Sequence, residues 1–344
     1  MTPRGTDWGL AFLVGLLFLT GVMSLFAGRE GDAWVFAVHG AGGFGLGAFV
    51  GWKLRRVWRR IVPAAGAAAA SVVLLTLLSG WAWSSGLDLS LAGYNLLAWH
   101  FALGTVLTVV VVVHALARAK PIRRADLASR RQFLALGAVA AGAYAAWWAQ
   151  RPISTFFGLR GARRRFTGSY EVASFEGNAF PTTSWVADRP QALDSSDYRL
   201  EVEGLVRRRL SLERSDLDAG DTLVATLDCT GGFYSRQRWG GVRLERLLDR
   251  AGPQAEASHV RVISHTGYRW SFGLDELPDL LLATTVGGEP LSHDHGAPVR
   301  LVARGRRGFQ WVKWVVRLEL RDGPDGGAMA STIWSSFTPE GRGA

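Results

Sequence analysis

The chain has 344 residues, a formal charge of +10, 48% hydrophobic residues and a single cysteine. This length accommodates roughly two domains. The positive charge alone would fit a nucleic-acid-binding protein. However, many of the arginines gather beside long apolar stretches and no recognition motif accompanies them, which argues against that class and against a nucleic-acid partner.

The first 120 residues contain four long apolar stretches, each close to the ~20 residues that a helix needs to cross a bilayer. They are Trp8–Ala27, Ala33–Trp52, Ile61–Trp83 and Asn95–Ala117. We therefore predict that residues 1–120 form a four-helix transmembrane domain.

The connectors between these stretches differ in charge, which predicts their orientation. Lys53–Arg60 and Lys120–Arg124 are strongly basic, whereas Gly28–Asp32 and Ser84–Gly93 are nearly neutral. Because basic loops stay in the cytoplasm, the two basic connectors and the N-terminus are expected on that side.

Residues 121–150 carry a fifth apolar run, Phe133–Trp148, directly after the segment Ala128–Leu134. That segment matches the twin-arginine export pattern, with Arg130 and Arg131 followed by an apolar pair. An ordinary cytoplasmic basic flank is the alternative, and both interpretations send the fifth helix outward. The protein is thus expected to be a multi-pass protein of the cytoplasmic (inner) membrane, with the domain that follows facing the periplasm or cell exterior.

Two histidines lie at similar depth in spans that both enter from the outer side. His39 is about six residues into the second span and His100 about five into the fourth, at ~1.5 Å per residue. This placement suits the two axial ligands of one haem b, although a polar residue hydrogen-bonded inside a bundle is the alternative. The first domain accordingly resembles a b-type cytochrome.

A third intramembrane histidine, His114, follows His100 by fourteen residues and so lies on nearly the same face, ~21 Å deeper. The spacing resembles that of two-haem b-type cytochromes. Lys53 stands where a partner for His114 would be, so a second haem is only one option.

The second half changes character after a basic linker, residues 151–172. Residues 173–325 are predicted to form an α+β domain rich in strands, followed by a tail, residues 326–344. Strands are expected at Leu223–Leu227, Tyr198–Val206, Val260–Ile263, Val299–Val302 and Trp311–Leu320. Short helices are expected at Leu212–Leu217, Leu244–Ala251 and Leu274–Leu282.

Cys229 follows a short strand and precedes a glycine-rich basic stretch that we interpret as a loop. A thiol there could ligate a soft metal, act as a nucleophile or fill the core, and the last is the commonest fate of a free cysteine. The nearby arginines supply the electropositive surroundings that a thiolate needs.

Several blocks in this half resemble, in the right order, the molybdopterin-binding domain of the sulfite oxidase superfamily. Within it, the similarity is to the bacterial branch of periplasmic methionine-sulfoxide reductase catalytic subunits. The blocks are Asp197–Val206, Asp228–Gly232, Trp239–Leu244, Gly288–Leu291, His295–Val302 and Gly308–Trp314.

The resemblance implies a molybdenum–molybdopterin cofactor with the Cys229 thiolate on the metal. A soft thiolate suits a redox metal already held by sulfur. Arg300 and Lys313 match the family's cations on the pterin phosphate. The further residues at cofactor-binding positions are Asn178, His265, His295, Trp311 and Val312.

The segment after Cys229 departs from the pattern of sulfite oxidases, because Gly231–Phe233 replaces an arginine-bearing segment. Arg236 and Arg238 are the nearest arginines and become the candidate catalytic residues beside Cys229. The substrate is expected to be a small oxyanion or a sulfoxide, undergoing oxygen-atom transfer. Electrons would pass between the haem and a quinone or another membrane carrier.

Two alternatives remain open at this stage. The chain could be a catalytically inactive, membrane-tethered pterin-fold binding or assembly module. It could also be an enzyme whose helical bundle is a plain anchor without haem.

Overall fold

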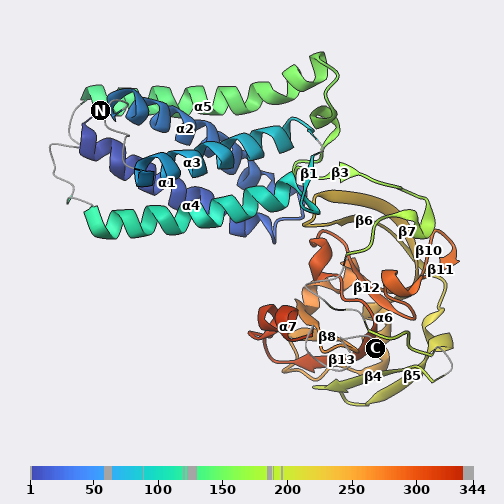
Figure 1. The fold of residues 1–344 in the computed structure, drawn as a ribbon. Helices are drawn as coiled ribbons and strands as arrows, with labels where there is room; N and C mark the ends of the chain where they lie inside the picture. The colour runs from blue at the N-terminus through green and yellow to red at the C-terminus, as the bar shows by residue number, and fades with distance from the viewer. Residues whose placement is uncertain are drawn as a thin grey trace. The chain divides into compact units, whose positions relative to one another are not determined.

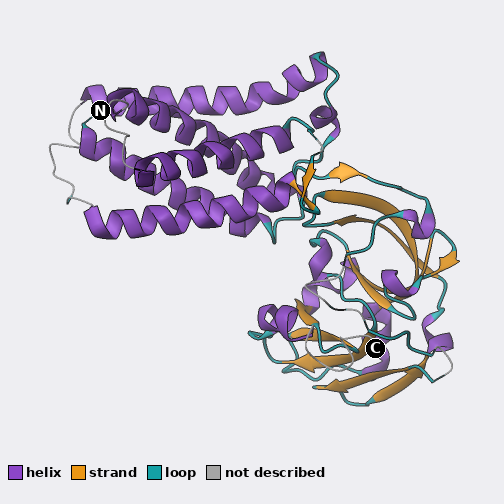
Figure 2. Ribbon diagram, viewed as in Figure 1, coloured by secondary structure: helices purple, strands orange, loops and turns teal. Residues whose placement is uncertain are grey.

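The computed structural model describes residues 2–57, 64–87, 89–118, 121, 130–183, 188, 190–194 and 197–335. The chain divides into two compact units, Met1–Tyr170 and Glu171–Ala344. The first unit is mostly helical, whereas the second unit contains the two larger sheets together with loops and short helices (Figures 1 and 2). The boundary falls inside the segment 151–172 that the sequence indicates as a linker.

Unit 1 contains five long helices. They are α1 (Pro3–Ser24), α2 (Ala33–Val57), α3 (Ala64–Ser84), α4 (Leu96–Arg118) and α5 (Arg130–Phe156). Among the described residues, these five are long and apolar enough to cross a membrane. The first begins with a side-chain cap, because Thr2 accepts a hydrogen bond from the Gly5 amide at 3.0 Å, and Pro3 fits the first helical position.

Small residues and a narrow apolar core hold the helices together. Helix α1 packs on α2 and α4, α2 packs on α5, and α3 packs on α4. Val14, Leu46 and Leu107 form the buried centre. A side-chain carbon at Gly40 would lie 2.3 Å from Trp147, so glycine permits the close approach of α2 and α5. The outer surface carries many exposed apolar side chains, including Phe12, Leu116 and Phe133.

Several sequence features of this unit fall partly outside the described residues. The connector Lys53–Arg60 is described only as far as Val57, and only Pro121 of Lys120–Arg124 is described. Ala128 and Ser129 of the twin-arginine-like segment and residues 336–344 of the tail also lie outside, whereas Arg130 and Arg131 begin α5.

Unit 2 is built around two mixed sheets. The six-stranded sheet runs β11-β10-β7-β3, with β12 paired to β10 and β6 paired to β7. Its strands are β3 (Tyr170–Glu171), β6 (Asp221–Asp228), β7 (Phe233–Arg243), β10 (Leu280–Val286), β11 (Glu289–Pro290) and β12 (Arg300–Ala303).

The five-stranded sheet has the order β5-β4-β13-β8-β9, with β13 parallel to β4 and antiparallel to β8. Its strands are β4 (Arg199–Gly204), β5 (Leu210–Glu213), β8 (His259–Ser264), β9 (Arg269–Gly273) and β13 (Val315–Arg321). Helices α6 (Leu244–Ala251) and α7 (Ala328–Trp334) complete the described part of the unit. The predicted strands at 198–206, 223–227, 260–263 and 299–302 and the helix at 244–251 are confirmed, within a few residues.

Three local predictions were right only in part, and Leu274–Asp279 is the helical part of the predicted Leu274–Leu282, as a 3-10 helix. Leu212 lies in β5 and pairs with Leu200, so only Arg214–Leu217 is helical, as a 3-10 turn. Leu280–Leu282 belongs to β10, which pairs with β7 and β12. A strand buried on both faces has a continuous apolar sequence, which does not distinguish it from a buried helix. Strand β13 begins only at Val315, because Trp314 adopts a positive φ of 51° that interrupts extended backbone.

The expected loop after Cys229 is a strand instead. Only Thr230–Gly232 forms a turn, and Phe233–Arg243 is the long strand β7, paired along its length with β6. Its residues alternate between buried and exposed, a period-two pattern that its glycines and arginines obscure in the sequence.

Candidate functional site

Cys229 stands at the end of β6, in a tight turn that fixes its backbone. Its amide donates to the Phe233 carbonyl at 2.8 Å, and its carbonyl accepts from the Gly232 amide at 3.1 Å. Gly232 has φ +97°, which glycine adopts without strain. The turn therefore presents the cysteine side chain, which is 7% exposed, in a defined direction.

The loop that contains Arg307 and Gly308 packs against this turn. Arg307 forms a buried ion pair with Asp228 at 2.7 Å and also donates to the Cys229 carbonyl at 3.3 Å. Gly308 approaches closely, since a side-chain carbon there would lie 3.2 Å from the Cys229 Cα. Truncating one partner of a buried pair is strongly destabilising, so this contact anchors the cysteine.

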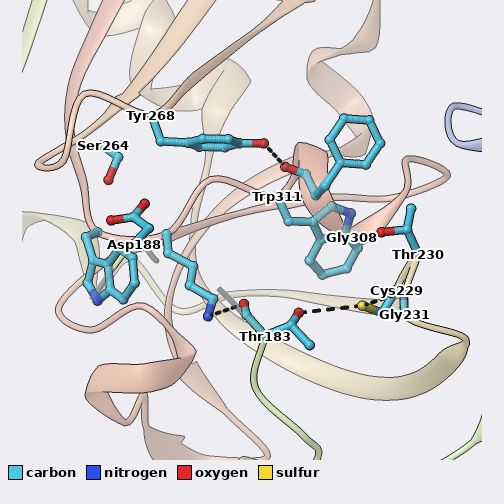
Figure 3. Close-up of a pocket in the computed structure, with 12 residues that line it drawn as sticks. Thr183, Asp188, Cys229, Thr230, Gly231, Ser264, Tyr268, Gly308 and Trp311 are labelled. Atoms are coloured by element: carbon cyan, nitrogen blue, oxygen red, sulfur yellow. Dashed lines mark hydrogen bonds between the residues drawn. The ribbon is translucent and has the colours of Figure 1, made fainter. Parts of the chain in front are cut away.

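The sulfur faces a cavity of about 240 Å³ and also lines a smaller one of about 30 Å³. Its Sγ accepts from the Gly231 amide at 3.3 Å and lies 3.5 Å from Thr183 Oγ1 (Figure 3). The thiolate is the form of cysteine that ligates metals. The larger cavity is lined by Thr183, Asp188, Cys229, Thr230, Gly231, Ser264, Tyr268, Gly308, Phe309, Trp311, Lys313 and Trp314.

Arg300 brings a buried positive charge to the smaller cavity. It is 2% exposed, donates to the His295 carbonyl at 2.9 Å and lies 5.2 Å and 5.8 Å from the ring centres of Trp239 and Trp311. Burial lowers the pKa of Arg300 to about 9. Its Nε is buried and has no hydrogen-bond partner in the described part of the chain. A buried guanidinium with an unsatisfied Nε–H fits an anionic group such as a cofactor phosphate.

Lys313 lines both cavities and adds a second cation. Its Nζ donates to the carbonyls of Thr183 at 3.0 Å and Asp294 at 2.6 Å. Burial, together with the nearby charge of Arg300, lowers the pKa of Lys313 to about 8. The two cations thus repel one another in a poorly solvated place, an arrangement that an anion between them would relieve.

His295 positions this part of the site. Its Nε2 donates to the Phe180 carbonyl at 2.9 Å, and its Nδ1 accepts from the Ser292 hydroxyl at 2.7 Å. Burial lowers the pKa of His295 to about 4, so the ring is neutral at neutral pH. Because both nitrogens bind the protein, His295 lines the smaller cavity without a spare donor for a cofactor.

Two residues that the sequence analysis missed lie in the larger cavity. Thr183 touches the sulfur, and Asp188 lies across the cavity from Cys229 in the view of Figure 3. The Asp188 carboxylate accepts from Thr266 Oγ1 at 3.0 Å, and burial raises its pKa. No periodic pattern marks either residue. The only signal was that their segment follows Asn178, which resembles the part of the family that approaches the metal.

The structure does not bring Arg236 and Arg238 to the cavities. Both point to the exposed face of β7, and the buried face carries Ser235, Gln237 and Trp239. This placement corrects their expected catalytic role, because alternate residues of a strand face opposite sides.

Asn178 and His265 do not line either of these two cavities, so their expected contact with a cofactor stays a prediction. The Asn178 amide donates to the Pro290 carbonyl at 2.9 Å and accepts from the Ser292 amide at 3.0 Å, so both ends tie loops together. His265 is half-buried in the turn between β8 and β9. The His265 backbone amide donates to the Trp314 carbonyl at 2.8 Å.

Trp311 and Val312 behave differently from each other. Trp311 lines the larger cavity, although its amide already donates to the Gly308 carbonyl at 3.1 Å. Val312 is fully buried and its carbonyl accepts from the Leu301 amide at 2.7 Å. Thus Trp311 offers its ring to the cavity, and Val312 fastens the segment to β12.

In unit 1, His39 and His100 face one another, with ring centroids 6.0 Å apart and planes at 82°. His100 Nδ1 donates to the Thr76 carbonyl at 2.9 Å, with Ser79 Oγ at 3.3 Å. A carbonyl can only accept, so this contact fixes the tautomer with a bare Nε2.

His39 is held in the same way. Its Nδ1 lies 3.0 Å from Thr20 Oγ1, and that hydroxyl donates to the Leu16 carbonyl at 2.8 Å. The Nδ1 proton therefore points to Thr20, which leaves the Nε2 lone pair for a ligand. Outer partners of this kind orient metal-binding histidines.

His114 has no comparable position. Its side chain is exposed on α4, and Lys53 forms an ion pair with Asp7 at 3.0 Å. The described residues thus bring His39 and His100 together but give His114 no facing imidazole, which argues against the second haem.

Comparison with known proteins identifies the second unit. Residues 186–329 match the family model described as "Oxidoreductase molybdopterin binding domain". This part of the chain is a molybdopterin-binding oxidoreductase domain. The cysteine turn, Arg300 and Lys313 all fall within the matched residues of this molybdopterin-binding domain.

The relatives of this chain include proteins named as reductases and oxidases. The chain is 27% identical to the protein-methionine-sulfoxide reductase catalytic subunit MsrP of Gluconobacter oxydans, over 63% of this chain and 76% of that protein. It is 30% identical to the nitrate reductase of Hordeum vulgare, over 36% of this chain and 18% of that protein. It is 32% identical to the mitochondrial sulfite oxidase of Rattus norvegicus, over 37% of this chain and 30% of that protein.

Proposed function

We propose that this chain is a membrane-anchored oxidoreductase of the oxygen-atom-transfer class, with molybdopterin bound around Cys229. The observation that carries the proposal is the meeting of three features in adjoining cavities. They are the only cysteine sulfur of the sequence, a buried guanidinium whose Nε has no partner among the described residues, and a second poorly solvated cation. The cofactor, when bound, supplies a metal that exchanges two electrons and an oxygen atom with substrate.

The residues of the chain then have distinct tasks. Cys229 Sγ ligates the metal, with the Gly231 amide and Thr183 hydroxyl directing the sulfur. Arg300 and Lys313 bind the phosphate through charge-assisted hydrogen bonds. Trp311 and its aromatic neighbours exclude water from the cavity, which strengthens each of these electrostatic contacts.

A neutral sulfoxide is the substrate that the cavity favours. Reduction of a sulfoxide consumes two electrons and two protons and releases a sulfide and water. Anionic substrates need cations beyond those that hold the cofactor, and Arg236 and Arg238 lie on the exposed face of β7. The lining also includes the Asp188 carboxyl group, which repels an anion when ionised. The name of the MsrP relative agrees with this class.

The helical unit is proposed to anchor the enzyme in the cytoplasmic membrane, with the molybdopterin domain on the outer side. Five apolar helices of spanning length and many exposed apolar side chains support this part of the proposal. The basic connectors support the orientation.

Haem b is proposed to bind between His39 and His100, where it would relay single electrons to or from quinone. Metal–imidazole bonds are about 2 Å long, so two imidazoles on opposite sides of one metal have ring centres roughly 6 Å apart. The observed centroid separation of 6.0 Å and the bare Nε2 atoms fit that requirement.

The test is metal analysis and activity of the purified full chain. We expect about one molybdenum per chain and reduction of a sulfoxide by a reduced electron donor. Cys229→Ser should abolish both. A wild-type chain that carries the pterin but turns over no sulfoxide, sulfite, nitrate or chlorate would indicate an inactive pterin-binding module instead.

The haem is tested separately by absorption spectroscopy. A reduced b-type band should be present in wild type and absent in His39→Ala and His100→Ala, with His114→Ala as the matched control that keeps it. A full band in either of the first two variants would leave the bundle as a plain anchor.

A further inference from the structure

The segment after α5 is folded onto the outer end of the helices by an aromatic contact beside His39. Phe166 packs edge-on against Phe36 of α2, with ring centroids 5.6 Å apart. The Arg165 guanidinium lies 5.3 Å from the Phe166 ring centre. Phe36 is three residues before His39, so this contact lies about one helical turn, ~5 Å, from the imidazole.

A matching contact lies beside His100. Trp83 of α3 packs against Tyr170 at 6.1 Å, and the Arg164 guanidinium lies 3.9 Å from the Trp83 ring centre. Gly80, three residues before Trp83, borders His100, since a side-chain carbon at Gly80 would lie 2.7 Å from the imidazole. Arg164 is thus also about one helical turn from its histidine.

The two arginines are held in place by a built turn. The Arg165 amide donates to the Ser169 carbonyl at 3.0 Å, and the Gly168 amide donates to the Arg165 carbonyl at 2.9 Å. Arg164 Nη1 donates to the Gly168 carbonyl at 2.6 Å. Both side chains are half-buried, so their charges act in a partly desolvated place where electrostatic effects are larger than in water.

A haem b carries two propionate carboxylates on one edge, and guanidinium groups bind carboxylates in bidentate geometry. We infer that Arg164 and Arg165 bind the two propionates, an inference that rests on the haem proposed between His39 and His100. The segment that leads into the molybdopterin domain is then part of the haem site. The two guanidiniums compensate the two carboxylates and raise the reduction potential of the iron.

The experiment measures the midpoint potential of the b-type band in the full-length protein in nanodiscs. The variants are Arg164→Gln, Arg165→Gln and the double variant, with Arg163→Gln, an exposed neighbour on the same segment, as control. In the double variant we expect the ratio of reduced to oxidised haem at fixed potential to fall about tenfold, which is 59 mV for a one-electron couple.

A second readout separates a charge effect from a structural one. Without the arginines the propionates titrate nearer neutrality, so the potential of the double variant should depend on pH between about 5 and 8. Wild type and the control should show little dependence in that range. Arg164→Lys and Arg165→Lys keep the charge and should retain most of the wild-type potential, even if a Gln variant loses haem.

Potentials and pH profiles equal to those of Arg163→Gln would overturn the inference. So would a shift that appears only in nanodiscs with anionic lipid, because the arginines would then face lipid headgroups. These results differ from failure of the proposed function, in which wild type has no b-type band or His39→Ala keeps it.

Discussion

Arg300 offers a direct thermodynamic test of the cofactor site. It is buried with no ion pair among the described residues. Its charge therefore destabilises the cofactor-free fold and contributes favourably only when an anion is bound. Replacing it with methionine, a side chain of similar length without charge, should stabilise the cofactor-free protein and weaken the cofactor-bound one.

The magnitude follows from the surroundings of Arg300. Burial lowers its pKa from 12.5 to about 9, and because one pKa unit corresponds to about 1.4 kcal/mol, the buried charge costs on the order of 5 kcal/mol. The hydrogen bond to the His295 carbonyl returns about 1.5–3 kcal/mol and the two tryptophan faces about 0.5–2 kcal/mol. The net gain in Arg300→Met is then between about 0 and 3 kcal/mol, with a rise in Tm of roughly 2–4 °C per kcal/mol.

The assay is thermal unfolding of the full chain from a host that cannot make the pterin and from one that can. The control is Arg317→Met, which removes an exposed arginine paired with Glu203 at 3.4 Å and should change stability by less than about 0.5 kcal/mol. Arg300→Met should raise the Tm without cofactor and lower both Tm and molybdenum content with it.

Equal destabilisation of Arg300→Met in both preparations would refute this reasoning. The guanidinium would then be a structural element of the core, satisfied by His295 and the tryptophans alone.

Three further predictions concern other parts of the molecule. Cys229→Ser should lower molybdenum content and activity by at least about 100-fold. The Tm should shift by no more than a few degrees, because a thiol and a hydroxyl have similar volume. Normal metal content in this variant would contradict the ligand role of Cys229. Burial raises the pKa of the Asp188 carboxyl group in the folded state above its ordinary value of 3.8. The folded state therefore keeps a proton that the unfolded chain loses above about pH 3.8, and the free energy of unfolding falls as pH rises through the pKa of the folded state. Asp188→Asn should therefore be more stable than wild type near pH 7 and equal to it below about pH 4 in urea unfolding, and a pH-independent difference would disprove the assignment. Gly80→Ala places a carbon 2.7 Å from the His100 ring and should shift or abolish the b-type band. The control Gly104→Ala meets open space and should leave the band unchanged. Identical spectra of the two variants would count against the haem pocket.

The sequence alone identified features that depend on local patterns. Helix α2 and the spans at 8–27 and 95–117 follow from runs of apolar residues, whose length is fixed by the rise of a helix. Cys229, Arg300 and Lys313 could be chosen because each lies inside a short block of characteristic composition. Their joint lining of the smaller cavity required the sheet pairing to be known.

Strand β7 shows where this reasoning failed. Arg236 and Arg238 are close to Cys229 in sequence, but a strand sends alternate residues to opposite faces, and the register with β6 decided which face is exposed. A glycine-rich basic stretch gives no apolar alternation from which that register could be read.

The sequence by itself predicted the class of each half and singled out Cys229, Arg300 and Lys313, because these predictions depend on composition and on contiguous motifs. Only the tertiary structure decided that Thr183 and Asp188 share a cavity with Cys229, that His39 and His100 lie 6.0 Å apart, and that Arg164 packs on Trp83. These contacts join residues about 40 to 80 positions apart. Such contacts depend on the packing of whole helices and sheets, which no local pattern records.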